Sequence, residues 1–138
     1  MKLSSQTLTG IIPVSTHTVN RYQKDDPVFP TPERIGRTNY FESADFFAWL
    51  NNRATRNGAS VPAGTIHNAD KILSFSGCCE LLDRSAAWGW QHITKNPDLT
   101  QIDLSPTGKS GNPRRYFIER EILAAFPELV ELQEVANA

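Results

Sequence analysis

Cysteine is nearly absent from this chain, and the only two, Cys78 and Cys79, are neighbours in the sequence. Adjacent cysteines suit neither an ordinary disulfide framework nor the CxxC spacing of a structural metal site. The three histidines, His17, His67 and His92, show no paired-ligand spacing either. We therefore expect no metal and no cofactor.

Long hydrophobic runs are also missing. No apolar segment approaches the roughly 20 residues that a membrane-spanning helix needs, and residues 1–6 lack the apolar stretch of a signal peptide. The sequence therefore predicts a cytoplasmic protein without a membrane segment.

Recognisable catalytic motifs are lacking as well. Gly108, Lys109 and Ser110 resemble the end of a phosphate-binding loop, but that motif requires a glycine where Asp103 stands. No serine or cysteine lies in a nucleophile motif. We expect a protein that is not an enzyme.

A strong excess of one charge is absent, because 14 basic side chains stand against 15 acidic ones. The balance nevertheless changes along the chain. Residues 1–68 carry 7 basic and 5 acidic side chains, whereas residues 128–138 carry 3 glutamates and no basic side chain. Nucleic-acid binding must therefore be argued from where the cations lie rather than from the isoelectric point.

A faint internal repeat is the most informative feature that is present. Residues 3–15 align with residues 73–85 at an offset of 70, and residues 37–41 align with residues 113–117 at an offset of 76. Self-similarity at a fixed spacing indicates a duplicated structural element. The second copy is six residues longer between its two halves.

Each copy predicts two short helices joined by a tight turn. A serine can cap the first helix, and Ser15 can cap a second helix over residues 16–24. The helical period then turns Val19 and Tyr22 inward. Two short helices in this order are typical of a helix-turn-helix.

A hairpin and a last helix follow the helix pair. Residues 34–41 alternate around Gly36 as a small hairpin does, and residues 43 to about 52 predict a helix with an aromatic inner face. The sequence therefore predicts a mainly α fold with small β-hairpin wings, built as two tandem winged helix-turn-helix units.

The predicted division has four parts. Unit 1 spans residues 1–52, and unit 2 spans residues 70–127 with a longer wing. Between them, residues 53–69 are small, polar and interrupted by Gly and Pro, which is typical of a flexible linker. Residues 128–138 predict a C-terminal helix or tail, whose apolar side either closes the core of unit 2 or supports a homodimer.

A resemblance to a known family rests on four stretches of unit 1, namely residues 14–22, Phe29-Pro30, residues 34–37 and residues 40–50. These stretches resemble the AlpA-like prophage-regulator and excisionase group, with MerR-type winged helices as wider relatives. Unit 2 is similar at residues 81–90 and 114–117. The resemblance implies sequence-specific binding to double-stranded DNA by a small protein of a mobile element or phage. Such a protein serves as a transcription regulator or as a directionality factor for an integrase.

The outward face of the second predicted helix carries side chains suited to DNA, provided that this helix is exposed. Asparagine can pair bidentately with adenine and arginine with guanine, whereas lysine suits a phosphate. Arginines beside Gly36 can reach a phosphate or the minor groove. We therefore expect DNA contacts in unit 1 from Ser15, Thr16, His17, Asn20, Arg21, Lys24, Arg34 and Arg37.

Unit 2 loses most hydrogen-bonding groups on the corresponding face. A glutamine there can read adenine, an alanine can touch a thymine methyl, and a tryptophan suits DNA or protein equally. The longer wing adds three cations and is either a backbone-gripping element or an ordinary loop. The expected contacts of unit 2 are Ala86, Trp90, Gln91, Lys109, Arg114 and Arg115.

Gly89 interrupts the second predicted helix of unit 2. A glycine inside a helix costs roughly 1 kcal/mol relative to alanine, and such a cost usually has a packing reason. We expect that reason to be room for Trp88 or Trp90.

Two other functions stay open at this point. The same helices can form a protein-interaction module that docks on an integrase or another phage protein through Trp88, Trp90 and the tail. They can also form the DNA-recognition module of a phage packaging machine.

Overall fold

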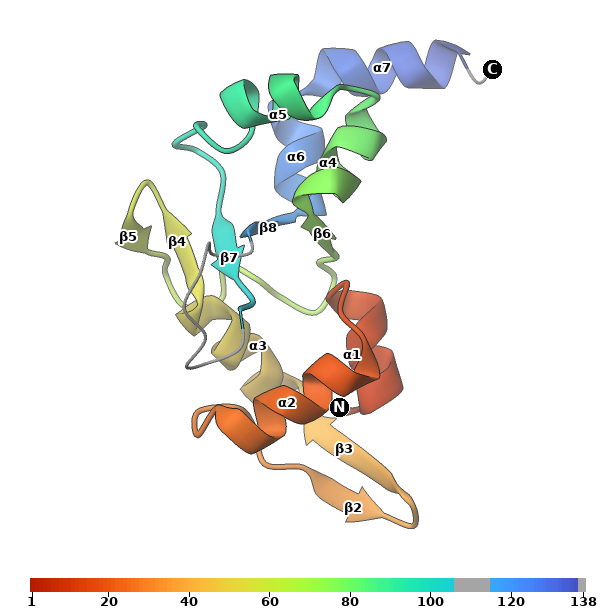
Figure 1. Cartoon of the computed structure of the whole chain (residues 1–138), viewed down its shortest axis with the longest axis vertical. Helices are drawn as coiled ribbons and strands as arrows, with labels where there is room; N and C mark the ends of the chain where they lie inside the picture. Colours follow the sequence, from red (N-terminus) through yellow and green to blue (C-terminus); the bar gives the residue numbers. More distant parts are fainter. Residues whose placement is uncertain (106–114, 137–138) are drawn as a thin grey trace.

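The computed structural model describes residues 1–105 and 115–136. Unit 1 contains β1 (Lys2–Ser4), α1 (Ser5–Ile11), α2 (Thr16–Asp25), β2 (Glu33–Ile35), β3 (Thr38–Glu42) and α3 (Ser43–Asn52). It is followed by the strand pair β4 (Ala54–Arg56) and β5 (Ala59–Ser60). Unit 2 contains β6 (Ile72–Ser74), α4 (Phe75–Leu82), α5 (Ala86–His92), β7 (Gln101–Asp103), β8 (Arg115–Ile118) and α6 (Glu119–Ala125), and α7 (Pro127–Ala136) follows it (Figure 1).

The helix starts agree with the sequence prediction. Ser4, Ser15, Ser74 and Ser85 are the N-caps of α1, α2, α4 and α5, and each side chain accepts a hydrogen bond from the backbone N–H three residues on. A cap of this kind is worth about 1 kcal/mol. The helix pair predicted for each unit is therefore confirmed, and its caps repeat at the offset of 70.

The strands repeat in the same way. In the first sheet, of order β1-β3-β2, Leu3 lies opposite Phe41. In the second sheet, of order β5-β4-β7-β8-β6, Leu73 lies opposite Phe117. These two pairs are related by the offsets of 70 and 76 that the sequence shows. The two units therefore share one order of elements and one strand register.

The prediction of a mainly α fold with small hairpins is wrong, because the described chain is α+β with one antiparallel sheet of three strands and another of five. Strands β1 and β6 lie directly before α1 and α4 and pair with β3 and β8. With three residues each, they are too short to show the alternation that identifies a strand in a sequence.

The segment expected to be a flexible linker is also structured. Strands β4 and β5 form a hairpin, whose turn carries the positive φ angles of Asn57 (51°) and Gly58 (80°). Such a pair of angles is typical of a tight hairpin turn. Ala54 pairs with Ile102 of β7, and the Asn51 side chain bonds both backbone groups of the buried Ile66. Residues 54–60 therefore extend the second sheet.

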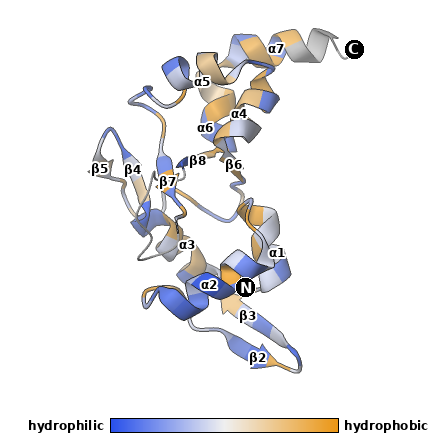
Figure 2. Cartoon of the chain, viewed as in Figure 1, coloured by the Kyte–Doolittle hydropathy of each residue, from blue (hydrophilic) through white to orange (hydrophobic). Residues whose placement is uncertain are grey.

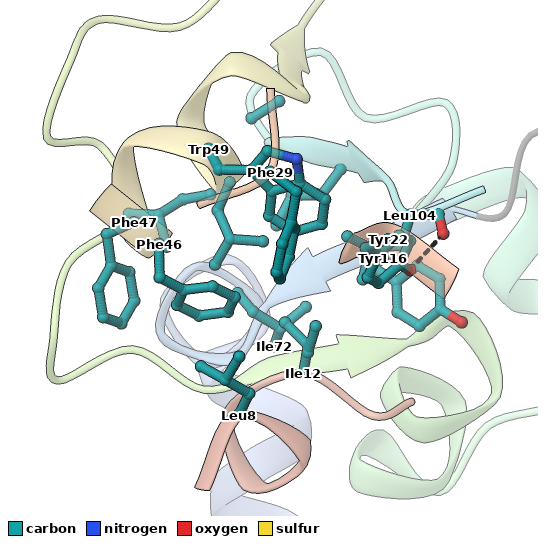
Figure 3. Packing of buried hydrophobic residues seen from close by; sticks show 14 of the residues in the cluster. Leu8, Ile12, Tyr22, Phe29, Phe46, Phe47, Trp49, Ile72, Leu104 and Tyr116 are labelled. Carbon is teal, nitrogen blue, oxygen red and sulfur yellow. Dashed lines mark hydrogen bonds between the residues drawn. The ribbon is translucent and has the colours of Figure 1, made fainter. Parts of the chain in front are cut away.

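The main hydrophobic core crosses the boundary between the units. Its side chains from unit 1 include Ile12, Tyr22 and Phe46, and those from unit 2 include Ile72 and Tyr116 (Figure 3). Burial of apolar surface is the main favourable term in folding. The two units are therefore packed against each other, and unit 1 shares its core with unit 2.

A second, smaller core lies within unit 2. Cys78, Leu82 and Ile122 are buried there, and Leu129 and Val130 of α7 pack against them. The tail thus closes the core of unit 2, which was one of the two alternatives for it. Among the described residues, no helix has the length and apolar character needed to cross a membrane.

Candidate nucleic-acid interface

Helix α2 presents one buried and one exposed face. Val19 and Tyr22 are buried, as the sequence predicts. Ser15 caps the helix with a 3.2 Å hydrogen bond from the backbone N–H of Thr18, and this end of the helix is open to solvent. Figure 2 shows α2 as predominantly hydrophilic. The inner face of α2 is therefore packed in the core, while its polar side is accessible to solvent.

The side chains expected to touch DNA lie on the polar side of α2. Arg21 is partly buried, and the rest are exposed. The helical period puts them on one surface, because positions three and four apart are neighbours. The structure therefore brings together five predicted residues of α2, namely Thr16, His17, Asn20, Arg21 and Lys24.

The cations of α2 and of the turn between β2 and β3 are not neutralised by acidic side chains of the described residues. Arg21, Lys24 and Arg37 form no ion pair within the described part of the chain. By contrast, the arginines that connect distant segments are paired, namely Arg53 with Asp26, Arg56 with Glu121 and Arg120 with Asp70. An unpaired cation keeps its charge available for a phosphate.

Polar contacts tie the inner side of α2 to unit 2. The Tyr22 hydroxyl donates to the backbone oxygen of Leu104 at 2.6 Å (Figure 3). The Arg53 guanidinium donates to the backbone oxygens of Asp103 and Ser105, both at 3.0 Å. Since these acceptors follow one another at the end of β7, the orientation of α2 relative to unit 2 is fixed.

Asp26, at the C-cap of α2, completes this set of contacts. It accepts hydrogen bonds from Arg53 at 2.6 Å and from the Trp49 indole at 2.9 Å. Burial acts to raise the pKa of Asp26, but these hydrogen bonds outweigh it and hold the pKa below its ordinary value. We call Tyr22, Asp26, Trp49 and Arg53 the anchor of α2.

The anchor was not predicted from the sequence. Its members come from α2, α3 and the residues after each, and its acceptors in unit 2 lie between 50 and 82 residues further on. No local sequence pattern predicts a contact between segments so far apart in the chain. The one usable signal is Asp26 itself, a carboxylate directly after a helix whose inner face ends in the aromatic Tyr22.

Hairpin β2–β3 carries the two other predicted residues of unit 1. Arg34 and Arg37 are exposed, and Arg34 Nε donates to the backbone oxygen of Gly36 at 3.2 Å. Gly36 has a φ of 64°, the left-handed region that favours glycine. The nearby Glu33 is paired with Lys2, so the net charge of the hairpin end comes from the two arginines.

Helix α5 of unit 2 occupies the same place in the repeat as α2 but has a different surface. Ala86, Trp90 and Gln91 are exposed, as predicted, and the Trp90 side chain is 53% exposed. Its ring lies 5.4 Å from that of Phe75. The outward side of α5 is therefore mainly apolar.

The reason for Gly89 differs from the expected one. A Cβ at this position would lie 2.6 Å from Cys79 Sγ and 2.9 Å from the Phe75 ring. Gly89 therefore allows α4 to approach α5 closely, and it does not make room for Trp88 or Trp90.

The wing of unit 2 is described only in part. Arg115 is exposed, with its guanidinium carbon 5.8 Å from the centre of the Trp90 ring. The predicted residues Lys109 and Arg114 lie outside the described residues. Arg84, beside the cap of α5, is exposed and forms no ion pair within the described residues, and it was not among the residues predicted from the sequence.

The cysteines are placed for packing rather than reactivity. Both are buried, and burial raises the pKa of Cys78 to about 12 and raises that of Cys79. A thiol with such a pKa is protonated at neutral pH and is a poor nucleophile. No cluster of three or more metal-ligating side chains occurs within residues 1–105 and 115–136.

Comparison with known proteins gives no match, because no protein-family model, curated protein or solved structure is significantly similar to this chain.

Proposed function

We propose that this chain binds double-stranded DNA through helix α2 and hairpin β2–β3 of unit 1. The observation that carries the proposal is the polar row of α2, that is Thr16, His17, Asn20, Arg21 and Lys24. Its cations form no ion pair with any described residue, and the other face of the helix is held in the core. This combination suits entry of a helix into the major groove, which is wide enough to admit one.

Different side chains of this surface have different tasks. Asn20 and Arg21, in the middle of α2, offer the amide and the guanidinium that recognise adenine and guanine. Lys24 and the arginines of the hairpin offer charge to the phosphates. Base contacts determine sequence preference, whereas phosphate contacts add affinity for any duplex.

For the biological role we rely on the resemblance of residues 14–22, Phe29-Pro30, residues 34–37 and residues 40–50 to the AlpA-like and excisionase group. We propose a regulator of transcription, or a recombination directionality factor, that belongs to a mobile element or phage. The anchor of α2 supports this role, because a fixed recognition helix loses little conformational freedom on binding.

The salt dependence of binding tests the proposal directly. Fluorescence anisotropy with a labelled 30-base-pair duplex, at a series of salt concentrations, gives the number of phosphate contacts. We expect Lys24→Ala to weaken binding at low salt and to reduce the salt slope by about one.

The matched control is Lys71→Ala. Lys71 is also an exposed lysine that forms no ion pair among the described residues, but it directly precedes β6, away from α2. We expect it to leave both affinity and slope unchanged. If the two variants behave alike, or if the wild-type chain does not bind duplex at low salt, the proposal is wrong.

The exposed Trp90 favours a second candidate function, protein binding through unit 2. Together with Ala86 and Ala87 it forms an apolar strip on α5, and tryptophan is the side chain most enriched at the centres of protein interfaces. In this case Trp90→Ala abolishes the association with an integrase or another phage protein, measured by calorimetry, and leaves DNA binding intact.

A further inference from the structure

Hairpin β2–β3 ends in an exposed isoleucine, which neither the anchor nor the polar row of α2 explains. Ile35 is the last residue of β2 and is 52% exposed. It belongs to neither hydrophobic core. A large aliphatic side chain is therefore held in solvent at the end of the element that carries Arg34 and Arg37.

The hairpin presents this side chain away from the body. Figure 1 shows β2–β3 projecting from the end of the molecule opposite α7. A Cβ at Gly36 would meet no atom within 4 Å, so the turn is unobstructed. Ile35 pairs with Thr38 across the two-residue turn, and the alternation of strands puts it on the face opposite buried Phe41.

The surroundings of Ile35 are positively charged. Arg34 precedes it and Arg37 follows the turn glycine, and neither forms an ion pair in the described chain. Glu33, the one acidic residue of β2, is neutralised by Lys2. The end of the hairpin is thus cationic and carries one exposed apolar side chain, Ile35.

We propose that Ile35 is a wedge that enters the minor groove of duplex DNA between two base pairs and kinks the duplex. The inference rests on the proposed function. Minor-groove proteins insert Ile, Leu, Phe or Met between base steps, and the unstacking opens the groove toward the protein. Arginines favour the same groove because its potential is strongly negative. An apolar point between two arginines on an unobstructed hairpin provides both groups.

The proposed kink gives the two elements of unit 1 separate tasks. Helix α2 selects the sequence, and the hairpin deforms the flanking step. Because the register of β2 with β3 joins the hairpin to the core through Phe41, the wedge is held at a fixed distance from α2. The energy of deformation then depends on the flanking sequence, and flexible pyrimidine–purine steps are favoured there.

Ligase-mediated ring closure tests the wedge on DNA of mixed sequence. A linear fragment of about 120 base pairs is shorter than the persistence length of about 150 base pairs, so it closes slowly unless it is bent. We expect the wild-type chain to accelerate closure by about tenfold or more, and Ile35→Ala to lose this acceleration while anisotropy still shows binding to the same fragment. Ile35→Leu keeps an apolar wedge and is expected to retain it.

The matched control is Leu132→Ala. Leu132 is another exposed aliphatic side chain, 62% exposed, on α7 at the other end of the molecule. We expect it to behave as wild type in ring closure. Thermal unfolding of each variant verifies that the fold is retained.

The outcomes separate this inference from the proposed function. Binding without accelerated closure, or equal acceleration by wild type and Ile35→Ala, contradicts the wedge and leaves DNA binding intact. Absence of binding by the wild-type chain at low salt contradicts both. Binding with acceleration that only Ile35→Ala loses supports both.

Discussion

Helices α2 and α5 occupy the same position in a repeat, yet their outward surfaces are opposite in character. Both are capped by a serine and follow a strand-helix element of the same register. Asn20 of α2 corresponds to Trp90 of α5, and Arg21 corresponds to Gln91. The two units thus share a backbone arrangement, while the side chains on the outward surfaces of α2 and α5 differ in chemistry.

The inner sides of α2 and α5 differ as well, because large and small side chains change places between the two helices of each unit. Val19 of α2 corresponds to Gly89 of α5, and Ser5 of α1 corresponds to Phe75 of α4. In unit 1 the second helix provides the side chain of Val19. In unit 2 the corresponding space beside Gly89 is filled by the Phe75 ring of the first helix. A packed core accepts such an exchange only when both partners change.

Breaking the anchor is expected to have the largest effect on stability. Arg53→Ala leaves the buried Asp26 carboxylate without its cation, and loss of one partner of a buried pair costs about 3 kcal/mol or more. Urea unfolding measures this loss. Arg84→Ala removes an exposed arginine of unit 2 that has no ion pair in the described part of the chain, and it is expected to stay within about 0.5 kcal/mol of wild type. Equal losses contradict the importance of the anchor.

The glycines of the two units are expected to respond with opposite signs. Gly89→Ala forces a Cβ against Cys79 and Phe75 and should cost about 1–2 kcal/mol. Gly10 lies in α1 with nothing within 4 Å of a Cβ, so Gly10→Ala should stabilise by about 0.5–1 kcal/mol. Thermal melting of both variants checks the sign, and stabilisation by Gly89→Ala is inconsistent with the close approach of α4 and α5.

A smaller loss is expected for Tyr22→Phe. The change removes the hydrogen bond to Leu104 and leaves the buried ring, which costs about 1 kcal/mol. Since this bond joins α2 to unit 2, we also expect Tyr22→Phe to accelerate hydrogen exchange, relative to wild type, more at the amides of α2 than at those of α5. If the substitution changes the exchange of the two helices equally, Tyr22 has no role in orienting α2.

The smallest change is expected on mild acidification. The pKa values of Asp26 and Asp70 lie below the ordinary value, so the stability that they contribute is complete above about pH 4, the value of the unfolded chain. It is lost only as the pH falls further, through the folded pKa values. Unfolding free energies should therefore be flat from pH 7 to pH 5, and the decrease below pH 4 should be smaller in Asp26→Asn.

Local sequence signals were sufficient to predict the helix starts and the buried face of α2. Serine caps and the inward positions Val19 and Tyr22 could be predicted, because capping and helical period depend on neighbouring residues. The Asn57-Gly58 turn is also a local hairpin signal. The strands on either side have only two or three residues, too few to show the alternation of a strand, so the composition of residues 53–69 favours a linker.

The rest depended on contacts between distant segments. Strands β1 and β6 exist because β3 and β8 provide partners about 40 residues away. The anchor joins Asp26 to Arg53 and both to the end of β7. The polar face of α2 needed only the helical period, and for that reason the candidate site of unit 1 was predicted more completely than the fold that supports it.

The most direct test of DNA recognition by α2 is selection of bound duplexes from a random pool, with wild type, Asn20→Ala, Arg21→Ala and Gln91→Ala compared. We expect wild type and Gln91→Ala to enrich the same sequence, and the two variants of α2 to lose preference at one position each, at a cost of about 1–3 kcal/mol. Enrichment that survives in both α2 variants and disappears in Gln91→Ala would show that the second helix pair, and not α2, recognises the bases.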